Sequence, residues 1–273
     1  MLKLPNDWIE HFEGRDIFEQ IFALKGEVYR EQPGRKTMRF AFQGRHYFAK
    51  IHGGIGLKEM LKNLLQFRLP VLGAENEWRA IQRLEQLGIN TTPLLGYGKR
   101  GGNPLQIQSF VITEELPQSI NLEDFCRDWA DSPPDHDLKS ALITKVAEIA
   151  RTVHGHGMNH RDFYICHFRL DISSGMDRPN PRKLKIYLID LHRMRIRRSI
   201  SRRSRLKDLA ALYFSSMDIG LTERDLLRFI RVYKDQPLRK CLSKDKFFWW
   251  QVKRRANALY RKYQRKYPDE INR

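Results

Sequence analysis

The segment HGHGMNHRDFYICHFRLDI, residues 154–172, contains four histidines, two aspartates and a cysteine. Its triplet His160-Arg161-Asp162 has the order of a kinase catalytic loop, in which the aspartate accepts the proton of a substrate hydroxyl that attacks the γ-phosphate of ATP. A second aspartate, Asp190, ends the apolar run KLKIYLID, where a kinase keeps its magnesium-binding aspartate. The two carboxylates predict a phosphoryl-transfer site.

Two other chemistries are open to residues 154–172. A structural zinc site usually takes two well-separated pairs of Cys or His, and the crowded histidines do not have that spacing. A Cys-His hydrolase needs an exposed and activated thiol, whereas Cys166 lies between Ile165 and a short apolar strand, which is typical of a small buried residue. We therefore expect the histidines, His154 included, to be mostly scaffold.

The first elements that must position this chemistry are strands. Residues 27–52 alternate aromatic or β-branched with basic residues and have turn signals at 32–34 and 43–44, which predicts an antiparallel meander of three strands. Lys50 lies in the third strand, where a kinase keeps the lysine that contacts the phosphates of ATP.

A helix over residues 74–88 is predicted next, because its apolar residues recur at helical spacing. Two glutamates at its start compete for Lys50. Glu77 lies on the apolar face of the helix, and Glu75 lies on another side of it. A carboxylate on a buried face needs a partner, so we expect Glu77 to pair with Lys50; in the alternative, both are ordinary surface charges.

The strand SFVITEEL, residues 109–116, is expected to lead into the linker, where backbone groups near Glu115 and Leu116 would meet the adenine edge of ATP. The composition changes at residue 117, and a long helix with a core-facing side is predicted from 138 towards the glycines at 155 and 157. We expect an α+β, two-lobed, protein-kinase-like fold: a small antiparallel-sheet N-lobe, residues 1–117, and a helical C-lobe, residues 118–273.

Two short strands, residues 167–172 and 183–190, flank a turn-forming segment and are predicted to pair as a hairpin. The start of the first strand then lies beside the end of the second. This pairing brings Asp162 and His167 close to Asp190.

Three long motifs resemble those of the lipopolysaccharide core heptose kinases of Gram-negative bacteria, within the Kdo and heptose kinases of eukaryotic-kinase-like fold: NHRDFYICHFRLD (159–171), LIDLHRMRIR (188–197) and RLKDLAALYFSSMDIGLTERDLLRFIRVY (205–233). The resemblance extends over nearly the whole chain. It implies ATP- and Mg²⁺-dependent phosphorylation of the first heptose of the inner core, with Asp162 as the catalytic aspartate and Asp208 steadying the catalytic loop. Open alternatives are a kinase of another core sugar (the second heptose or Kdo), a protein kinase, and a kinase-like fold without activity.

One departure from protein kinases concerns the metal. His167 stands five residues after Asp162, where a protein kinase has a metal-binding asparagine. Because Mg²⁺ prefers oxygen ligands, either His167 binds a second ion less tightly, with Mn²⁺ tolerated, or Asp190 alone holds the metal firmly.

The composition, 50 Lys and Arg against 32 Asp and Glu, gives a net charge of +18 and indicates polyanionic partners. Seven arginines lie in HRMRIRRSISRRSR, residues 192–205, which suits an acidic glycolipid acceptor on an anionic membrane surface; a solvated basic loop is the alternative. The aromatic and basic C-terminal stretch is either an interfacial helix or a packed terminal one. Acidic protein partners also fit this charge. A nucleic-acid-binding module would explain the charge but not Lys50, Glu77, Asp162 and Asp190 in kinase order, so no nucleic acid is expected.

Three cysteines without paired spacing predict no disulfide framework and a reducing compartment. The N-terminus lacks the apolar core of a secretion signal, and no apolar run reaches the ~18 residues that span a bilayer. We expect a cytoplasmic protein, peripheral on the inner face of the cytoplasmic membrane.

Overall fold

The computed structural model describes residues 1–268 apart from 33, 55–72, 104–105, 117 and 176–178. The chain forms two compact units. The first unit comprises residues 1–86, 92–116 and 191–193, and the second comprises 87–91, 117–190 and 194–273. The predicted lobe boundary at residue 117 lies outside the described residues, and the division into lobes 1–117 and 118–273 stays a prediction.

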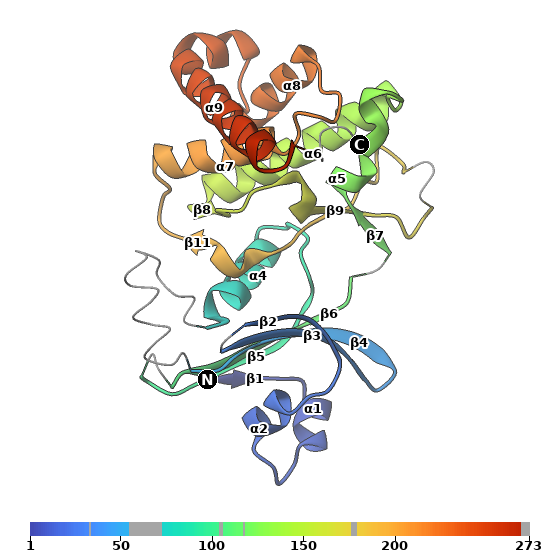
Figure 1. Ribbon diagram of the computed structural model, residues 1–273, viewed down its shortest axis with the longest axis vertical. Coiled ribbons are helices and arrows are strands. Elements are labelled where there is room, and N and C mark those ends of the chain that lie inside the picture. Colours follow the sequence, from blue (N-terminus) through green and yellow to red (C-terminus); the bar gives the residue numbers. More distant parts are fainter. Residues whose placement is uncertain (33, 55–72, 104–105, 117, 176–178, 269–273) are drawn as a thin grey trace. The chain divides into compact units, whose positions relative to one another are not determined.

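The first unit is built on a six-stranded antiparallel sheet with the strand order β1-β5-β6-β4-β3-β2 (Figure 1). The predicted meander and the strand near 109–116 are confirmed. The sheet is larger than expected because β1 and β5 join its other edge. The strands are β1 Leu2–Lys3, β2 Glu27–Gln32, β3 Arg35–Phe42, β4 Arg45–His52, β5 Leu94–Arg100 and β6 Gln108–Glu114.

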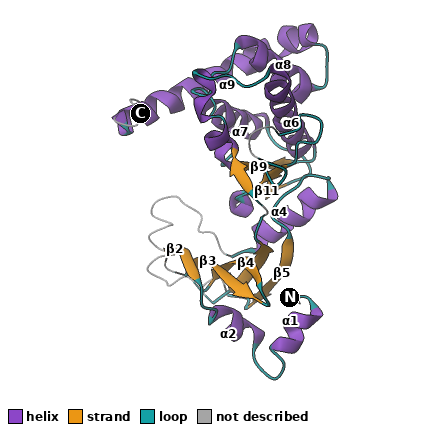
Figure 2. Ribbon diagram, turned by 90° about the vertical axis from the view of Figure 1, so that its right-hand side faces the viewer, coloured by secondary structure: helices purple, strands orange, loops and turns teal. Residues whose placement is uncertain are grey.

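Helices α1 (Asn6–His11) and α2 (Ile17–Phe22) pack on one face of this sheet, and α4 (Glu75–Gln86) lies on the other (Figure 2). Trp8 of α1 is buried against the aromatic side chains of β3 and β4. Alternation along β4 sends Tyr47, Ala49 and Ile51 into this core. The side chain of Lys50 therefore lies on the opposite face of the sheet, where α4 packs.

The second unit is mainly helical and contains two small sheets (Figure 1). Its helices are α5 Leu122–Phe125, α6 His136–Gly155, α7 Arg202–Phe214, α8 Glu223–Lys234 and α9 Leu238–Lys266, with 3₁₀ turns η1 Arg127–Ala130 and η2 Ile165–His167. Its strands are β7 Ser119–Asn121, β8 Met158–Asn159, β9 Phe168–Asp171, β10 Ile186–Leu188 and β11 Arg195–Ile196. The predicted α+β class, with an antiparallel-sheet part and a helical part, is confirmed.

The elements around residue 160 follow the sequence pattern. The predicted long helix is α6, which buries Leu142, Val146, Ile149 and Val153 on one side. The predicted hairpin is β9 with β10, paired antiparallel in register. Among the described residues, no helix is long and apolar enough to cross a lipid bilayer.

Candidate active site

Lys50 on β4 and Glu77 in the first turn of α4 form an ion pair, with Lys50 Nζ 2.5 Å from Glu77 Oε1. Glu77 is only 5% exposed, as its place on the apolar face predicts. Its other oxygen, Oε2, is buried without a hydrogen-bond partner among the described residues. The predicted pairing is confirmed, and the role of the pair towards ATP stays a prediction.

Glu75 forms a separate cluster on the same helix. Its carboxylate contacts Lys99 Nζ and Arg79 Nη2, each at 2.6 Å. The hydrogen bond from Lys99 is the main reason that the pKa of Glu75 lies below its usual value. The two neighbouring glutamates therefore have different partners, as the helical face predicted.

His52 is a buried group on the Lys50 face of β4. It lies two residues after Lys50, so its side chain points to the same side of the sheet. Burial, with smaller contributions from the charges of Arg35 and Lys50, lowers the pKa of His52 to about 3. His52 is therefore neutral at physiological pH. His52 was not among the predicted site residues, although the period of two along a strand assigns it to the same face as Lys50.

The side chain of Glu115, by contrast, points to a surface ion pair. Its two carboxylate oxygens accept hydrogen bonds from Arg39 Nε and Nη2, each at 2.9 Å, and the pair lowers the pKa of Glu115. Its backbone N–H donates to the carbonyl of His46 at 3.1 Å. The roles predicted for Glu115 and the half-buried Leu116 towards the adenine of ATP stay predictions.

In the second unit, Asp208 of α7 holds the backbone of the predicted catalytic loop. Its carboxylate accepts hydrogen bonds from the N–H of His160 at 2.7 Å and of Arg161 at 3.0 Å, and it is almost completely buried. Arg161 has a left-handed backbone, with φ 76°, which costs energy outside glycine and persists only where neighbouring contacts impose it. These contacts fix the backbone that carries the half-buried Asp162.

His167 links Asp162 to Asp190. Its Nδ1 lies 2.6 Å from the backbone carbonyl oxygen of Asp162, and its Nε2 lies 3.5 Å from Asp190 Oδ2. A carbonyl oxygen only accepts, so Nδ1 carries a proton, and Nε2 faces the carboxylate of Asp190. The backbone of Asp190 is also left-handed, with φ 61°. The predicted proximity of Asp162, His167 and Asp190 is confirmed.

An imidazole lone pair beside a carboxylate is a donor set that fits a divalent cation. Across the described part of the chain, no three His, Cys, Asp or Glu side chains come together in a group that could hold a metal ion. A cation at His167 and Asp190 would therefore take its remaining ligands from phosphate oxygens and water, as Mg²⁺ in nucleotide sites does. The metal-binding roles of His167 and Asp190 stay predictions.

His154, His156 and the cysteine of the segment point elsewhere, whereas the ring of His160 stacks on that of His167 at a centroid distance of 5.6 Å. His154 is buried between Tyr233 and Asp208, and burial lowers its pKa. His156 is exposed and bonds the carbonyl of Thr152 at 2.8 Å. Burial raises the pKa of Cys166 to about 11, so its sulfur is a thiol at neutral pH and not the thiolate that a hydrolase needs.

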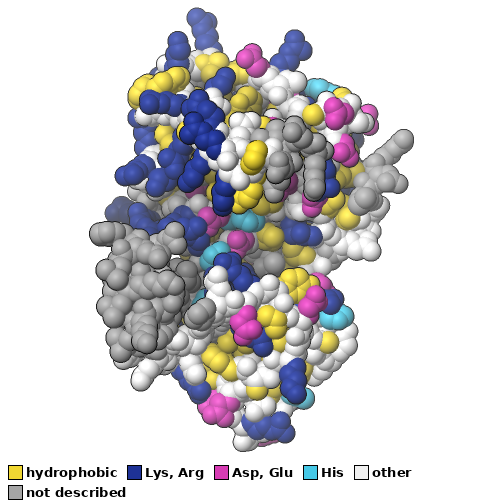
Figure 3. All heavy atoms as spheres, viewed as in Figure 1, with side chains coloured by type: hydrophobic (Ala, Val, Ile, Leu, Met, Phe, Trp, Pro, Cys, Tyr) yellow, Lys and Arg dark blue, Asp and Glu magenta, His cyan; other side chains and the backbone are white. Residues whose placement is uncertain are grey.

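The arginine-rich segment, residues 192–205, runs beside the strand that leads into the predicted catalytic loop. Strand β11 pairs with β8, and the N–H of Arg197 donates to the carbonyl of Gly157 at 2.9 Å. A Cβ at Gly157, whose φ is +74°, would lie 1.8 Å from the carbonyl oxygen of Arg197, so only glycine permits this approach. Exposed arginines follow, and Figure 3 shows Lys and Arg gathered over α7 and α9.

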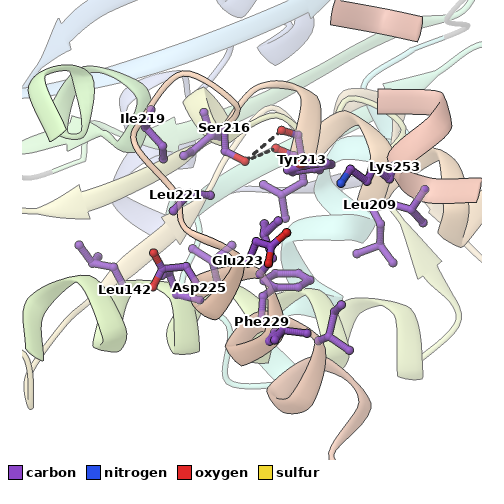
Figure 4. A pocket seen from close by; sticks show the side chains of 18 of the residues that line it. Leu142, Leu209, Tyr213, Ser216, Ile219, Leu221, Glu223, Asp225, Phe229 and Lys253 are labelled. Carbon is purple, nitrogen blue, oxygen red and sulfur yellow. Dashed lines mark hydrogen bonds between the residues drawn. The ribbon is translucent and has the colours of Figure 1, made fainter. Parts of the chain in front are cut away.

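An apolar cavity of about 480 Å³ lies among the helices of the second unit (Figure 4). Its walls come mainly from α6, α7, α8 and α9, with Leu142, Leu209 and Phe229 among the lining residues. No local sequence pattern predicts this cavity, because residues from several helices and turns that are far apart in the sequence define its shape.

Comparison with known proteins places this geometry in a family. Residues 19–233 match the model described as "Lipopolysaccharide kinase (Kdo/WaaP) family". The chain is 47% identical, over 97% of its length and 99% of the relative's, to the lipopolysaccharide core heptose(I) kinase WaaP of Escherichia coli strain K12. It is 48% identical to WaaP of Pseudomonas aeruginosa strain PAO1, over 93% of this chain and 94% of that one. A solved structure, "WaaP in complex with acyl carrier protein", matches with a TM-score of 0.81 and 42% identity over 95% of this chain and 99% of that chain.

Proposed function

Since the chain belongs to the lipopolysaccharide kinase (Kdo/WaaP) family, we propose that it is a core heptose(I) kinase, which transfers the γ-phosphate of ATP to a hydroxyl of the first inner-core heptose. The observation that carries this proposal is the catalytic loop itself: Asp162 follows a backbone held by Asp208, and His167 joins it to Asp190. A kinase of the second heptose or of Kdo is the nearest alternative.

Each proposed role follows from one contact. Lys50, held by Glu77, contacts the phosphates of ATP. Asp190 and His167 would hold Mg²⁺, which would supply positive charge against the phosphates of ATP; Mn²⁺ would be tolerated because one ligand is a nitrogen. The heptose oxygen bonds to the γ-phosphorus, the bond from that phosphorus to the β,γ-bridging oxygen breaks, ADP leaves, and Asp162 takes the hydroxyl proton.

The acceptor is proposed to bind at the arginine-rich segment, residues 192–205. Pairing of β11 with β8 places this segment beside the entry to the catalytic loop, and Arg197 and Arg198 are exposed. Exposed guanidinium groups suit the anionic groups of an inner-core glycolipid, because they form paired hydrogen bonds with carboxylate and phosphate.

We also propose that α9 binds the anionic inner face of the cytoplasmic membrane. Phe247 and Trp250 are 60% and 50% exposed and stack on each other, with the guanidinium groups of Arg202 and Arg254 over their rings. Asp245, the acidic residue of α9, is paired with Lys234. Co-sedimentation with phosphatidylglycerol vesicles tests this role, and a Phe247→Ser/Trp250→Ser variant that sediments like the wild type would contradict it.

An acyl carrier protein is the protein partner that we propose, because a solved relative was determined in complex with one. The apolar cavity supports this proposal, since its walls suit a fatty-acyl chain (Figure 4). Binding of acylated but not of apo acyl carrier protein to the purified chain is the expected result.

The activity is tested by incubating the purified chain with ATP labelled at the γ-phosphate, Mg²⁺ and core lipopolysaccharide that lacks heptose phosphate. We expect label in the core, none in protein or oligonucleotide substrates, and loss of transfer when EDTA removes the cation. Transfer to protein in preference to the core would contradict the proposal. Transfer to a core that already carries phosphate on the first heptose would indicate a kinase of the second heptose or of Kdo.

A further inference from the structure

Tyr233 of α8 is connected to the backbone of the proposed catalytic loop through the side chains of His154 and Asp208. It is 6% exposed, and its hydroxyl oxygen is 2.9 Å from His154 Nδ1. His154 Nε2 in turn lies 3.4 Å from Asp208 Oδ2. The same oxygen of Asp208 accepts the hydrogen bond from the N–H of His160. A buried chain of contacts thus runs from α8 to the backbone before Asp162.

The chemistry of these groups determines which group donates and which accepts in each hydrogen bond of this series. Asp208 already accepts two backbone N–H bonds, so it serves as the acceptor, and His154 Nε2 is the donor. His154 is neutral because burial lowers its pKa, so its Nδ1 has no proton and accepts. Tyr233 must then donate, and burial, which raises its pKa, keeps its hydroxyl protonated. Tyr233 therefore selects the tautomer of His154 that supports Asp208.

Two aromatic neighbours of Tyr233 line the apolar cavity. Phe229, one turn earlier on α8, stacks on its ring at a centroid distance of 5.9 Å and an angle of 9°. Trp249 of α9 meets the same ring edge to face at 5.9 Å. Both Phe229 and Trp249 line the cavity, and Figure 4 shows Phe229 in its wall. A ligand that moves either side chain acts directly on the ring of Tyr233.

We propose that Tyr233 is a positioning residue that couples the apolar cavity to the catalytic loop: an apolar chain in the cavity changes the hold of Tyr233 on His154, and hence of Asp208 on the loop. This inference rests on the proposed function, in which Asp162 is the catalytic base. The inference adds regulation to the proposed kinase activity. A ligand in the cavity of the helical unit would change turnover without contacting the reacting groups.

Tyr233→Phe tests the coupling, since it removes one hydroxyl and keeps the ring packing. We expect kcat to fall roughly tenfold with KM for ATP unchanged, because nucleotide contacts are untouched. The matched control is Tyr260→Phe, which removes a tyrosine hydroxyl that donates to Asp218 at 2.6 Å in the same unit. Dodecanoate, the probe for the cavity, should change kcat of the wild type and of Tyr260→Phe much more than that of Tyr233→Phe.

A second measurement does not depend on activity. Hydrogen exchange of the backbone amides of His160 and Arg161, which Asp208 holds, should be faster in Tyr233→Phe than in the wild type or in Tyr260→Phe. Faster exchange in a chain without heptose kinase activity would overturn the proposed function and leave the contact chain standing. Unchanged exchange, unchanged kcat, or an equal response of wild type and Tyr233→Phe to dodecanoate would overturn the coupling.

Discussion

Two ion pairs on α4 allow a comparison at the scale of single residues. Lys50 with Glu77 and Lys99 with Glu75 join the same helix to the same sheet with nearly equal separations, but Glu77 is buried and Glu75 is less so. If Lys50 orients ATP, Lys50→Ala should lower kcat/KM for ATP roughly 10²–10³-fold, as loss of one preorganised charged donor does. Glu77→Gln should act in the same direction, because the ammonium loses its buried partner.

The control for these variants is Lys99→Ala combined with Glu75→Gln. It removes an ion pair of similar geometry from the same surface, and ATP turnover should stay near normal. Steady-state kinetics with ATP varied distinguishes the two cases. Turnover of Lys50→Ala close to that of the control would show that the pair only supports the fold.

His52 makes a prediction about acid stability. Its folded-state pKa of about 3 lies below the value of about 6.5 expected for an unfolded chain. Between these values the unfolded state binds the additional proton, so the free energy of unfolding falls as the pH falls below about 6.5. His52→Gln lacks this proton uptake, so its unfolding free energy, measured by urea denaturation, should decline less steeply from pH 7 to 5. Equal slopes for both proteins would contradict a neutral, buried His52.

Single residues also show how far sequence reasoning reaches. Glu77 was identified because the helical period assigns it to the apolar face, and His167 was placed beside Asp190 because a hairpin joins the two segments. The contact of His154 with Tyr233 was not foreseen. These residues are 79 positions apart, and only the packing of α6 against α8 brings them together. No local period encodes such a contact.

At the scale of elements, the pairing of β8 with β11 depends on Gly157. Gly157→Ala should displace β11, since the added Cβ overlaps the carbonyl oxygen of Arg197, and should weaken binding of the core acceptor more than binding of ATP. Gly44→Ala is the matched control: its φ of +75° imposes the same backbone strain, and no atom lies within 4 Å of its Cβ.

Titration of each variant with nucleotide and with dephosphorylated core lipopolysaccharide measures its affinity for ATP and for the acceptor. Both variants should lose roughly 1 kcal/mol or more of stability from the left-handed backbone alone. Only Gly157→Ala should lose acceptor affinity selectively. Equal affinities of the two variants for the acceptor would contradict the proposal that the arginine-rich segment binds the acceptor.

The predicted elements succeeded where the pattern was local. Alternation along 27–52, the helical period after residue 74 and the turn between β9 and β10 each predicted the observed element. Strand β5 was missed because Gly96 and Gly98 interrupt its pattern. Their hydrogens make room for Leu4 and Phe110, since a Cβ would lie 2.5 Å from side-chain atoms of these residues. This requirement comes from the packed sheet and not from strand propensity.

At the scale of the whole molecule, the charge of +18 has a location. Helix α9 alone carries many of the basic residues, and their side chains gather with those of α7 on one surface of the second unit (Figure 3). Composition indicated polyanionic partners and could not choose among them. Family membership favours a glycolipid acceptor, whereas the apolar cavity, which composition does not reveal, supports an acylated partner.

The central claim is that Asp162 is the base that accepts the heptose proton, and Asp162→Asn tests it most directly. Asparagine has nearly the same shape and can keep the backbone contact to His167, so the variant should fold and bind ATP with Mg²⁺ as the wild type does. Phosphate transfer to the heptose should fall by about 10²–10⁴-fold, because the amide takes up no proton. Unimpaired transfer by an Asp162→Asn protein with normal nucleotide binding would contradict the account.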